Sequence, residues 1–142
     1  MSKILQDVTY AAEAAVAAMQ KRAGGKLDYS PQSLSMVEEL LAEAAPFVRE
    51  LPEAALTSLV QQIGCYVLEV ARKEFGGVYA WFTEKQQPVL VVGGPEAHIA
   101  LMTWSKVRGR LMGDVGDNIP FFFQGFAERA RAPAEGERVL FI

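Results

Sequence analysis

The sequence contains one cysteine and one histidine among its 142 residues. A single cysteine cannot form an internal disulfide, and one histidine is too few for the usual Cys/His zinc clusters. The formal net charge of −3 lacks the basic excess expected of a nucleic-acid-binding domain. No apolar run approaches the roughly 18 residues that a membrane span needs, and residues 1–7 are too polar for a signal peptide. We therefore expect a cytoplasmic protein that binds neither nucleic acid nor membrane.

The composition is that of an ordinary globular protein, with 51% hydrophobic and 22% charged residues. These proportions exclude a disordered, collagenous or coiled-coil chain. A chain of this length is typical of one domain and can bury a core without disulfides or metals. We therefore predict a single domain that covers residues 1–142.

The first half of the chain has the periodicity of helices. Apolar residues recur at helical spacing within residues 4–22, 31–45 and 52–75, which we predict to be three helices. The third has a broad apolar face, which predicts a central helix packed on several sides. Gly64 costs about 1 kcal/mol relative to alanine inside that helix, so we expect another backbone to pack closely against it.

The second half begins with alternating apolar residues, which are typical of strands. The order of helices, strands and further helices predicts an α+β fold. We expect N-terminal helices, a small antiparallel sheet of about three strands and two C-terminal helices. A further strand at the C-terminal end pairs either within the chain or with another chain. The expected strands are residues 78–83, 88–92, 98–103 (with a helix as the alternative) and 138–142, and the expected helices are residues 106–112 and 119–131, the latter capped by Asp117 or Asn118.

Large apolar side chains occupy both faces of the first two expected strands. A sheet that is apolar on both faces must be covered twice. The N-terminal helices can cover one face, and either the last helix or a second protomer can cover the other. The competing interpretation is an exposed aromatic surface that binds a partner. Its candidate residues are Tyr79, Trp81, Phe122 and Phe126.

The segment Ile63–Arg72 (IGCYVLEVAR), followed by Gly76-Gly77 and Trp81, carries a resemblance. It resembles a group of small bacterial domains of unknown function, in which a glycine-containing helix ends in glycine and leads into a tryptophan-bearing hairpin. A short basic helix follows, here residues 106–110. The resemblance covers roughly residues 30–130 and implies a fold, but no catalytic residue.

No motif in the chain specifies catalysis or a cofactor. Cys65 and His98 could form a nucleophile pair, but no local signature joins them, and we expect Cys65 to be packed or partly exposed. The glycines of residues 109–116 match neither a P-loop nor a dinucleotide fingerprint. The loop of residues 114–118 lacks the spacing of a calcium-binding EF-hand. We therefore expect no catalytic residue, no metal and no cofactor.

Charged residues suggest one further candidate site. Lys106, Arg108 and Arg110 follow Trp104 and could hold an anion or an acidic partner, or simply form a solvated helix face. Near the end of the third helix, we expect the charges of Glu69, Arg72 and Lys73 to be solvated.

These observations favour a non-enzymatic module that binds an unknown protein partner, with a homodimer fitting the same pattern. The alternative is a small protein that binds an anionic ligand, or a minor enzyme. Its pocket would lie between the sheet and residues 106–110, with Arg108 or Arg110 holding the anion.

Overall fold

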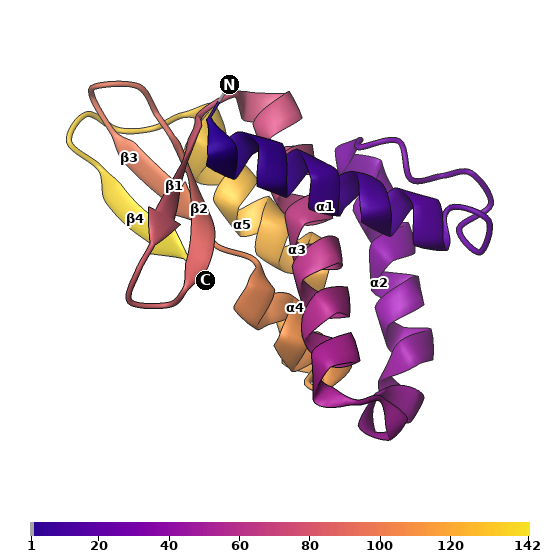
Figure 1. The fold of residues 1–142 in the computed structure, drawn as a ribbon. Coiled ribbons are helices and arrows are strands. Elements are labelled where there is room, and N and C mark those ends of the chain that lie inside the picture. Colours follow the sequence, from indigo (N-terminus) through magenta and orange to yellow (C-terminus); the bar gives the residue numbers. More distant parts are fainter. Residues whose placement is uncertain (1) are drawn as a thin grey trace.

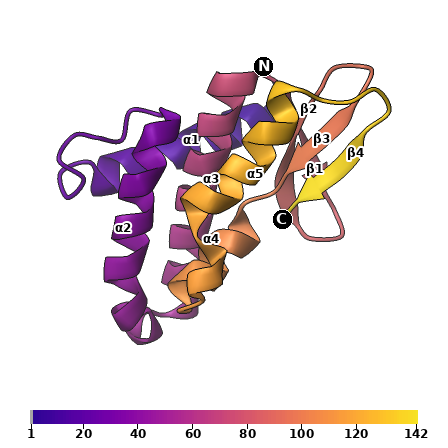
Figure 2. The ribbon, with the colours of Figure 1, turned by 180° about the vertical axis from the view of Figure 1, so that it is seen from behind.

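A computed structural model describes residues 2–142 and confirms the α+β fold. The strands lie together on one side of the molecule and the helices on the other (Figures 1 and 2). The first predicted helix ends earlier than expected, at Met19, and the second begins after a 3-10 turn at Pro31–Ser33. The elements are α1 (Lys3–Met19), α2 (Leu34–Ala44), α3 (Glu53–Phe75), β1 (Val78–Phe82), β2 (Gln87–Val92), β3 (His98–Leu101), α4 (Trp104–Leu111), α5 (Ile119–Arg131) and β4 (Arg138–Phe141).

The ends of several helices follow from local side-chain chemistry. The Ser2 hydroxyl accepts a hydrogen bond from the Leu5 amide at the start of α1, and Ser30 caps the turn before α2. At the start of α5 it is Asn118, rather than Asp117, that accepts a hydrogen bond from Phe121 N at 2.9 Å. Gly76 ends α3 with a positive φ of 76°, which glycine adopts without strain.

The sheet is mixed rather than antiparallel. Its strand order is β1-β2-β3-β4, and the first two pairs are antiparallel, but β4 runs parallel to β3 with Ile99 opposite Val139. A parallel pair needs a crossover, and α4 and α5 provide it between β3 and β4. The predicted antiparallel arrangement of the first three strands and the C-terminal strand are both confirmed. The direction of the fourth strand was not predicted, because strand patterns do not encode how the chain returns.

Helix α3 lies at the centre of the core. Tyr66, Val67, Leu68, Val70 and Ala71 are all buried, although they point to different sides of the helix. Helix α1 packs along it, and α4, α5 and β2 also contact it (Figure 1). Among the described helices, α3 alone is long and apolar enough to span a membrane, but 61% of that window is buried inside the protein. The apolar character of α3 is therefore explained by its place in the core.

Helix α5 covers the same face of the sheet as α3. Phe126 of α5 packs edge-on against Phe75 of α3 at 5.7 Å and against Phe141 of β4 at 6.0 Å, between ring centroids. Of the two alternatives for the second face, the last helix or a second protomer, the structure therefore excludes the last helix. The crossover from β3 to β4 places α5 beside α3, and none of the helices formed by residues 2–142 lies over the opposite face of the sheet (Figure 2).

Gly64 is the point at which the chain between β3 and α4 meets α3. The Thr103 hydroxyl donates a hydrogen bond to the Gly64 carbonyl at 2.7 Å. A Cβ atom on Gly64 would lie only 2.4 Å from Cδ1 of the Trp104 indole. The predicted close approach is thus present, but it comes from side chains rather than from another backbone.

We predict that Gly64→Ala destabilises the protein although alanine is the better helix former. The better helix propensity of alanine would raise the free energy of unfolding by about 1 kcal/mol. The clash with the half-buried Trp104 indole is overpacking, which lowers it by about 1–3 kcal/mol. Urea denaturation measures the difference. Gly125→Ala in α5 is the control, because its Cβ would meet Phe141 at an ordinary 3.6 Å. Gly125→Ala should raise the unfolding midpoint, and an equal rise for Gly64→Ala would contradict the packing argument.

Candidate functional site

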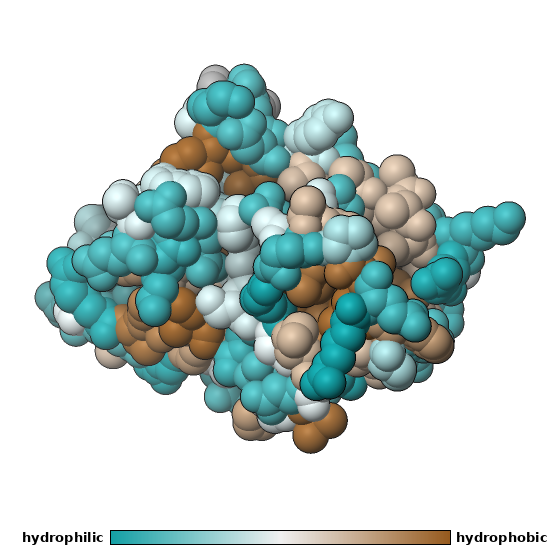
Figure 3. All heavy atoms as spheres, turned by 60° about the horizontal axis from the view of Figure 1, so that its bottom comes forward, coloured by the Kyte–Doolittle hydropathy of each residue, from teal (hydrophilic) through white to brown (hydrophobic). Residues whose placement is uncertain are grey.

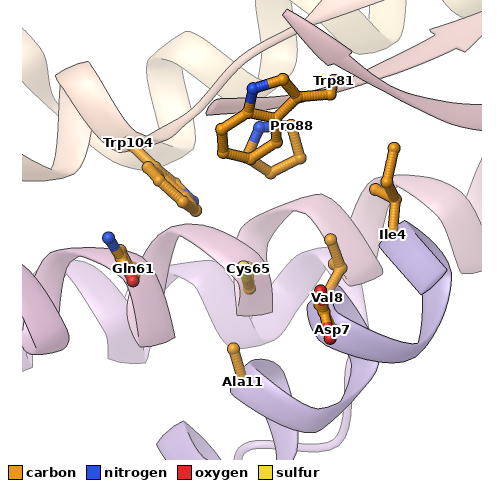
Figure 4. A pocket seen from close by; sticks show the side chains of 9 residues that line it. All are labelled: Ile4, Asp7, Val8, Ala11, Gln61, Cys65, Trp81, Pro88 and Trp104. Atoms are coloured by element: carbon orange, nitrogen blue, oxygen red, sulfur yellow. The ribbon is translucent and has the colours of Figure 1, made fainter. Parts of the chain in front are cut away.

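A cavity of about 290 Å³ lies between α1, α3, the β1–β2 hairpin and the first residue of α4 (Figure 4). Trp81 and Pro88 of the hairpin lie above it, and α1 and α3 form its floor. It is lined by Ile4, Asp7, Val8, Ala11, Gln61, Cys65, Trp81, Pro88 and Trp104. We call it the tryptophan pocket.

Two indole rings define one side of the tryptophan pocket. Trp81 and Trp104 pack edge-to-face, with ring centroids 6.3 Å apart and an angle of 76° between the planes. The Trp104 backbone amide donates to the side-chain oxygen of Gln87, and Thr103 anchors the preceding residue to α3. The Trp104 Nε1 atom is buried against α3 and makes no hydrogen bond with the described residues. Tertiary contacts therefore hold Trp104 in place, whereas Trp81 remains 47% exposed.

Cys65 lies in the floor of the tryptophan pocket as a neutral thiol. Burial raises the pKa of Cys65 to about 12, and the nearby Trp104 indole only partly offsets that rise. The thiolate, which is the nucleophilic form, is therefore scarce at neutral pH. His98 is exposed at the start of β3, on the opposite face of the sheet, so the two residues do not form a pair.

The three basic residues of α4 each pair with a carboxylate. Lys106 bonds to Asp117 at 3.0 Å and Arg108 to Glu53 at 2.7 Å, while Arg110 pairs with Glu38 of α2. None of the three lines the tryptophan pocket. Instead of converging on an anion, they connect α4 to α2, to the start of α3 and to the turn before α5.

The structure buries part of the expected aromatic surface in the core and exposes the rest. Tyr79 and Phe126 are buried. Phe122 is half-buried beneath the Lys106 ammonium, which lies 5.4 Å from the centre of its ring. Trp81 is exposed at the hairpin, far along the chain from Phe121, which is exposed on α5. Helix α5 faces the core with most of its phenylalanines, so these residues cannot form one exposed patch.

Glu69 belongs to a buried polar cluster that the sequence analysis missed. Its carboxylate is 2% exposed, accepts two hydrogen bonds from Arg72 at 2.6 and 2.9 Å, and accepts one from the Tyr79 hydroxyl at 2.8 Å. Burial by itself would raise the pKa of Glu69, but the hydrogen bonds from Arg72 and Tyr79 outweigh burial and lower it. The expectation of a solvated Glu69 was wrong because its partner Tyr79 comes from β1.

The outer face of the sheet, which turns away from the helices, is the second candidate site. Strand register places Val78, Val91, Ala100 and Leu140 in one row across all four strands. Ala100 of this row forms a small separate apolar cluster with Val89 and Met102, and all three side chains are buried under their neighbours on this face. Val78 is 72% exposed and Leu140 44% exposed. In Figure 3 a small apolar area is visible on the side where Figure 1 places the strands, and a larger one lies over the helices.

The outer face differs from the binding surface predicted from the sequence, because Tyr79 and Trp81 lie on the inner side of the sheet. Apolar residues on both faces of β1 and β2 predicted that both faces of the sheet are covered. In the part of the chain that the structure describes, helices cover only the inner face. The two polar side chains of the outer face, His98 and Arg138, lie together at one end of it.

Among residues 2–142, no group of three or more His, Cys, Asp or Glu side chains could hold a metal ion. Comparison of the chain with protein-family models, with curated proteins and with solved structures finds no match.

We predict that Tyr79→Phe lowers stability by about 1.5–3 kcal/mol at neutral pH, because a buried carboxylate loses a hydrogen-bond donor. The lowered pKa of Glu69 means that the folded state binds this proton less tightly than the unfolded state. The contribution of Glu69 to the free energy of unfolding is therefore present above its ordinary pKa of 4.5. It is lost as the pH falls through the pKa of Glu69 in the folded state.

The difference between wild type and Tyr79→Phe should therefore shrink below about pH 4.5, as measured by urea denaturation across pH. Tyr10→Phe is the matched control, because Tyr10 is 77% exposed and its loss should have no effect. A difference that stays constant with pH would show that Tyr79 acts through packing alone.

Proposed function

We propose that this protein is a non-enzymatic interaction module of the cytoplasm that pairs with a second copy of itself through the outer face of its sheet. The observation that carries the proposal is a four-stranded sheet whose outer face has no helix of residues 2–142 over it and exposes Val78 and Leu140 on its two edge strands. Soluble proteins seldom leave large contiguous apolar patches in water, and such patches mark interaction sites.

The chemistry of the outer face favours a second copy over a different partner. The cores of homodimer interfaces are more apolar than other interfaces and poor in charge. The row of Val78, Val91, Ala100 and Leu140 meets this description, because His98 and Arg138 are confined to one end. A two-fold axis, the commonest symmetry of oligomers, would place one outer face on another and cover both at once.

Nothing in the site geometry favours the enzymatic or anion-binding alternatives. Cys65 is neutral and lies away from His98, and the basic side chains of α4 already have carboxylate partners. A cytoplasmic location is part of the proposal, since the free Cys65 thiol suits a reducing compartment.

The test places one charge on the outer face. Val78→Glu should convert a dimer into a folded monomer, because a carboxylate buried in an apolar interface without a partner weakens association at least about tenfold. Leu140→Glu, on the opposite edge strand, should do the same. Val115→Glu is the matched control, since Val115 is 77% exposed in the turn between α4 and α5. Sedimentation velocity at several concentrations measures the association, and circular dichroism confirms folding.

A wild-type protein that stays monomeric at every accessible concentration would refute self-association. A dimer that is disrupted by Val115→Glu but not by Val78→Glu or Leu140→Glu would place the interface elsewhere. The proposal requires wild type and Val115→Glu to dimerise while both variants of the sheet do not.

A further inference from the structure

The tryptophan pocket lies on the inner side of the sheet and is separate from the outer face. Trp81 and Pro88 are opposite each other in the β1–β2 register, on the same side as the buried Tyr79 and Leu90. The pocket is thus independent of the proposed self-association, and a ligand could occupy it in a monomer or a dimer.

The walls of the pocket combine aromatic rings with negative charge. Trp81 and Trp104 line it together with the Asp7 carboxylate, and neither lysine nor arginine is among its described lining residues. In addition to burial, the charges of Glu69 and Asp7 raise the pKa of Cys65, so negative charge acts on the pocket floor. Indole rings attract cations more strongly than other aromatic side chains do.

The Asp7 carboxylate can exchange its present partner for a ligand. It pairs with Lys3 at 2.9 Å, one turn earlier on α1, and both side chains are largely exposed, at 61% and 83%. Exposed pairs of this kind contribute about 0–1 kcal/mol, so Lys3 is easily displaced. Asp7 and the two indoles come from three different elements, and only the tertiary structure brings them together (Figure 4).

The size and the remaining lining of the pocket restrict the ligand. A volume of about 290 Å³ is at the lower end of the range for ligand sites. Ile4, Val8, Ala11 and Pro88 provide apolar contacts suited to alkyl groups. We propose that the tryptophan pocket binds a small, soluble organic ammonium ion, with its alkyl groups against the apolar walls and its charge between the indoles and Asp7.

The composition of the protein makes this proposal easy to test. Its two tryptophans both line the pocket, so the whole tryptophan emission reports on the site. Choline is the probe, and neohexyl alcohol, in which a carbon atom replaces the nitrogen of choline, is the uncharged control of the same shape. Both are titrated at constant ionic strength, and saturation-transfer NMR on the methyl groups detects any binding that leaves the fluorescence unchanged.

We expect saturable binding of choline and at least about tenfold weaker binding of neohexyl alcohol, the ratio that a partly desolvated cation–π contact supplies. Trp81→Leu should abolish choline binding, and Asp7→Asn should weaken it severalfold. Both residues are exposed enough for the variants to fold. Glu13→Gln, which removes a carboxylate elsewhere on α1, is the matched control and should bind as wild type does.

Three outcomes would overturn the proposal. Equal binding of both probes would show an apolar pocket that does not select charge. No saturable signal by either method would show that the pocket does not take this class of ligand. Binding to phosphatidylcholine vesicles, but not to free choline, would contradict the assignment to a soluble ion.

Discussion

The burial of helix α3 is the constraint on which the rest of the structure depends. Its side chains are buried on several sides, so no single layer can cover it. Helix α1 covers one side, while α4, α5 and the sheet cover others. Gly64 allows the start of α4 to approach closely, because Thr103 bonds to its carbonyl and Cδ1 of the Trp104 indole lies only 2.4 Å from the place of a Cβ. The position of Trp104, and with it the tryptophan pocket, follows from this contact.

The same packing explains why the described helices cover only one face of the sheet. The chain leaves β3, forms α4 and α5 against α3, and returns to pair β4 in parallel with β3. Both crossover helices are thereby used on the inner side, where Phe126 meets Phe75 and Phe141. Both candidate sites follow from this arrangement. The tryptophan pocket lies between the hairpin and the helices, and the outer face lies on the side of the sheet without a described helix.

Charged residues show where reasoning from the chain alone reached its limit. Spacing along a helix suggested that Glu69, Arg72 and Lys73 would be solvated, yet Glu69 is buried with Arg72 and Tyr79 around it. Arg108 and Arg110 suggested an anion site, yet their carboxylates come from residues 53 and 38. Such partners are distant in sequence, and no local pattern identifies them.

The type and order of the elements could be read from periodicity and turn residues, because these patterns reflect interactions within a few residues. They located α3, α5 and the strands closely, and alternation indicated a sheet that is apolar on both faces. Strand direction, the face that α5 covers, the meeting of Trp81, Trp104 and Asp7, and the burial of Glu69 were settled only by packing. Each depends on how distant segments share the surface of α3, which is a property of the whole fold.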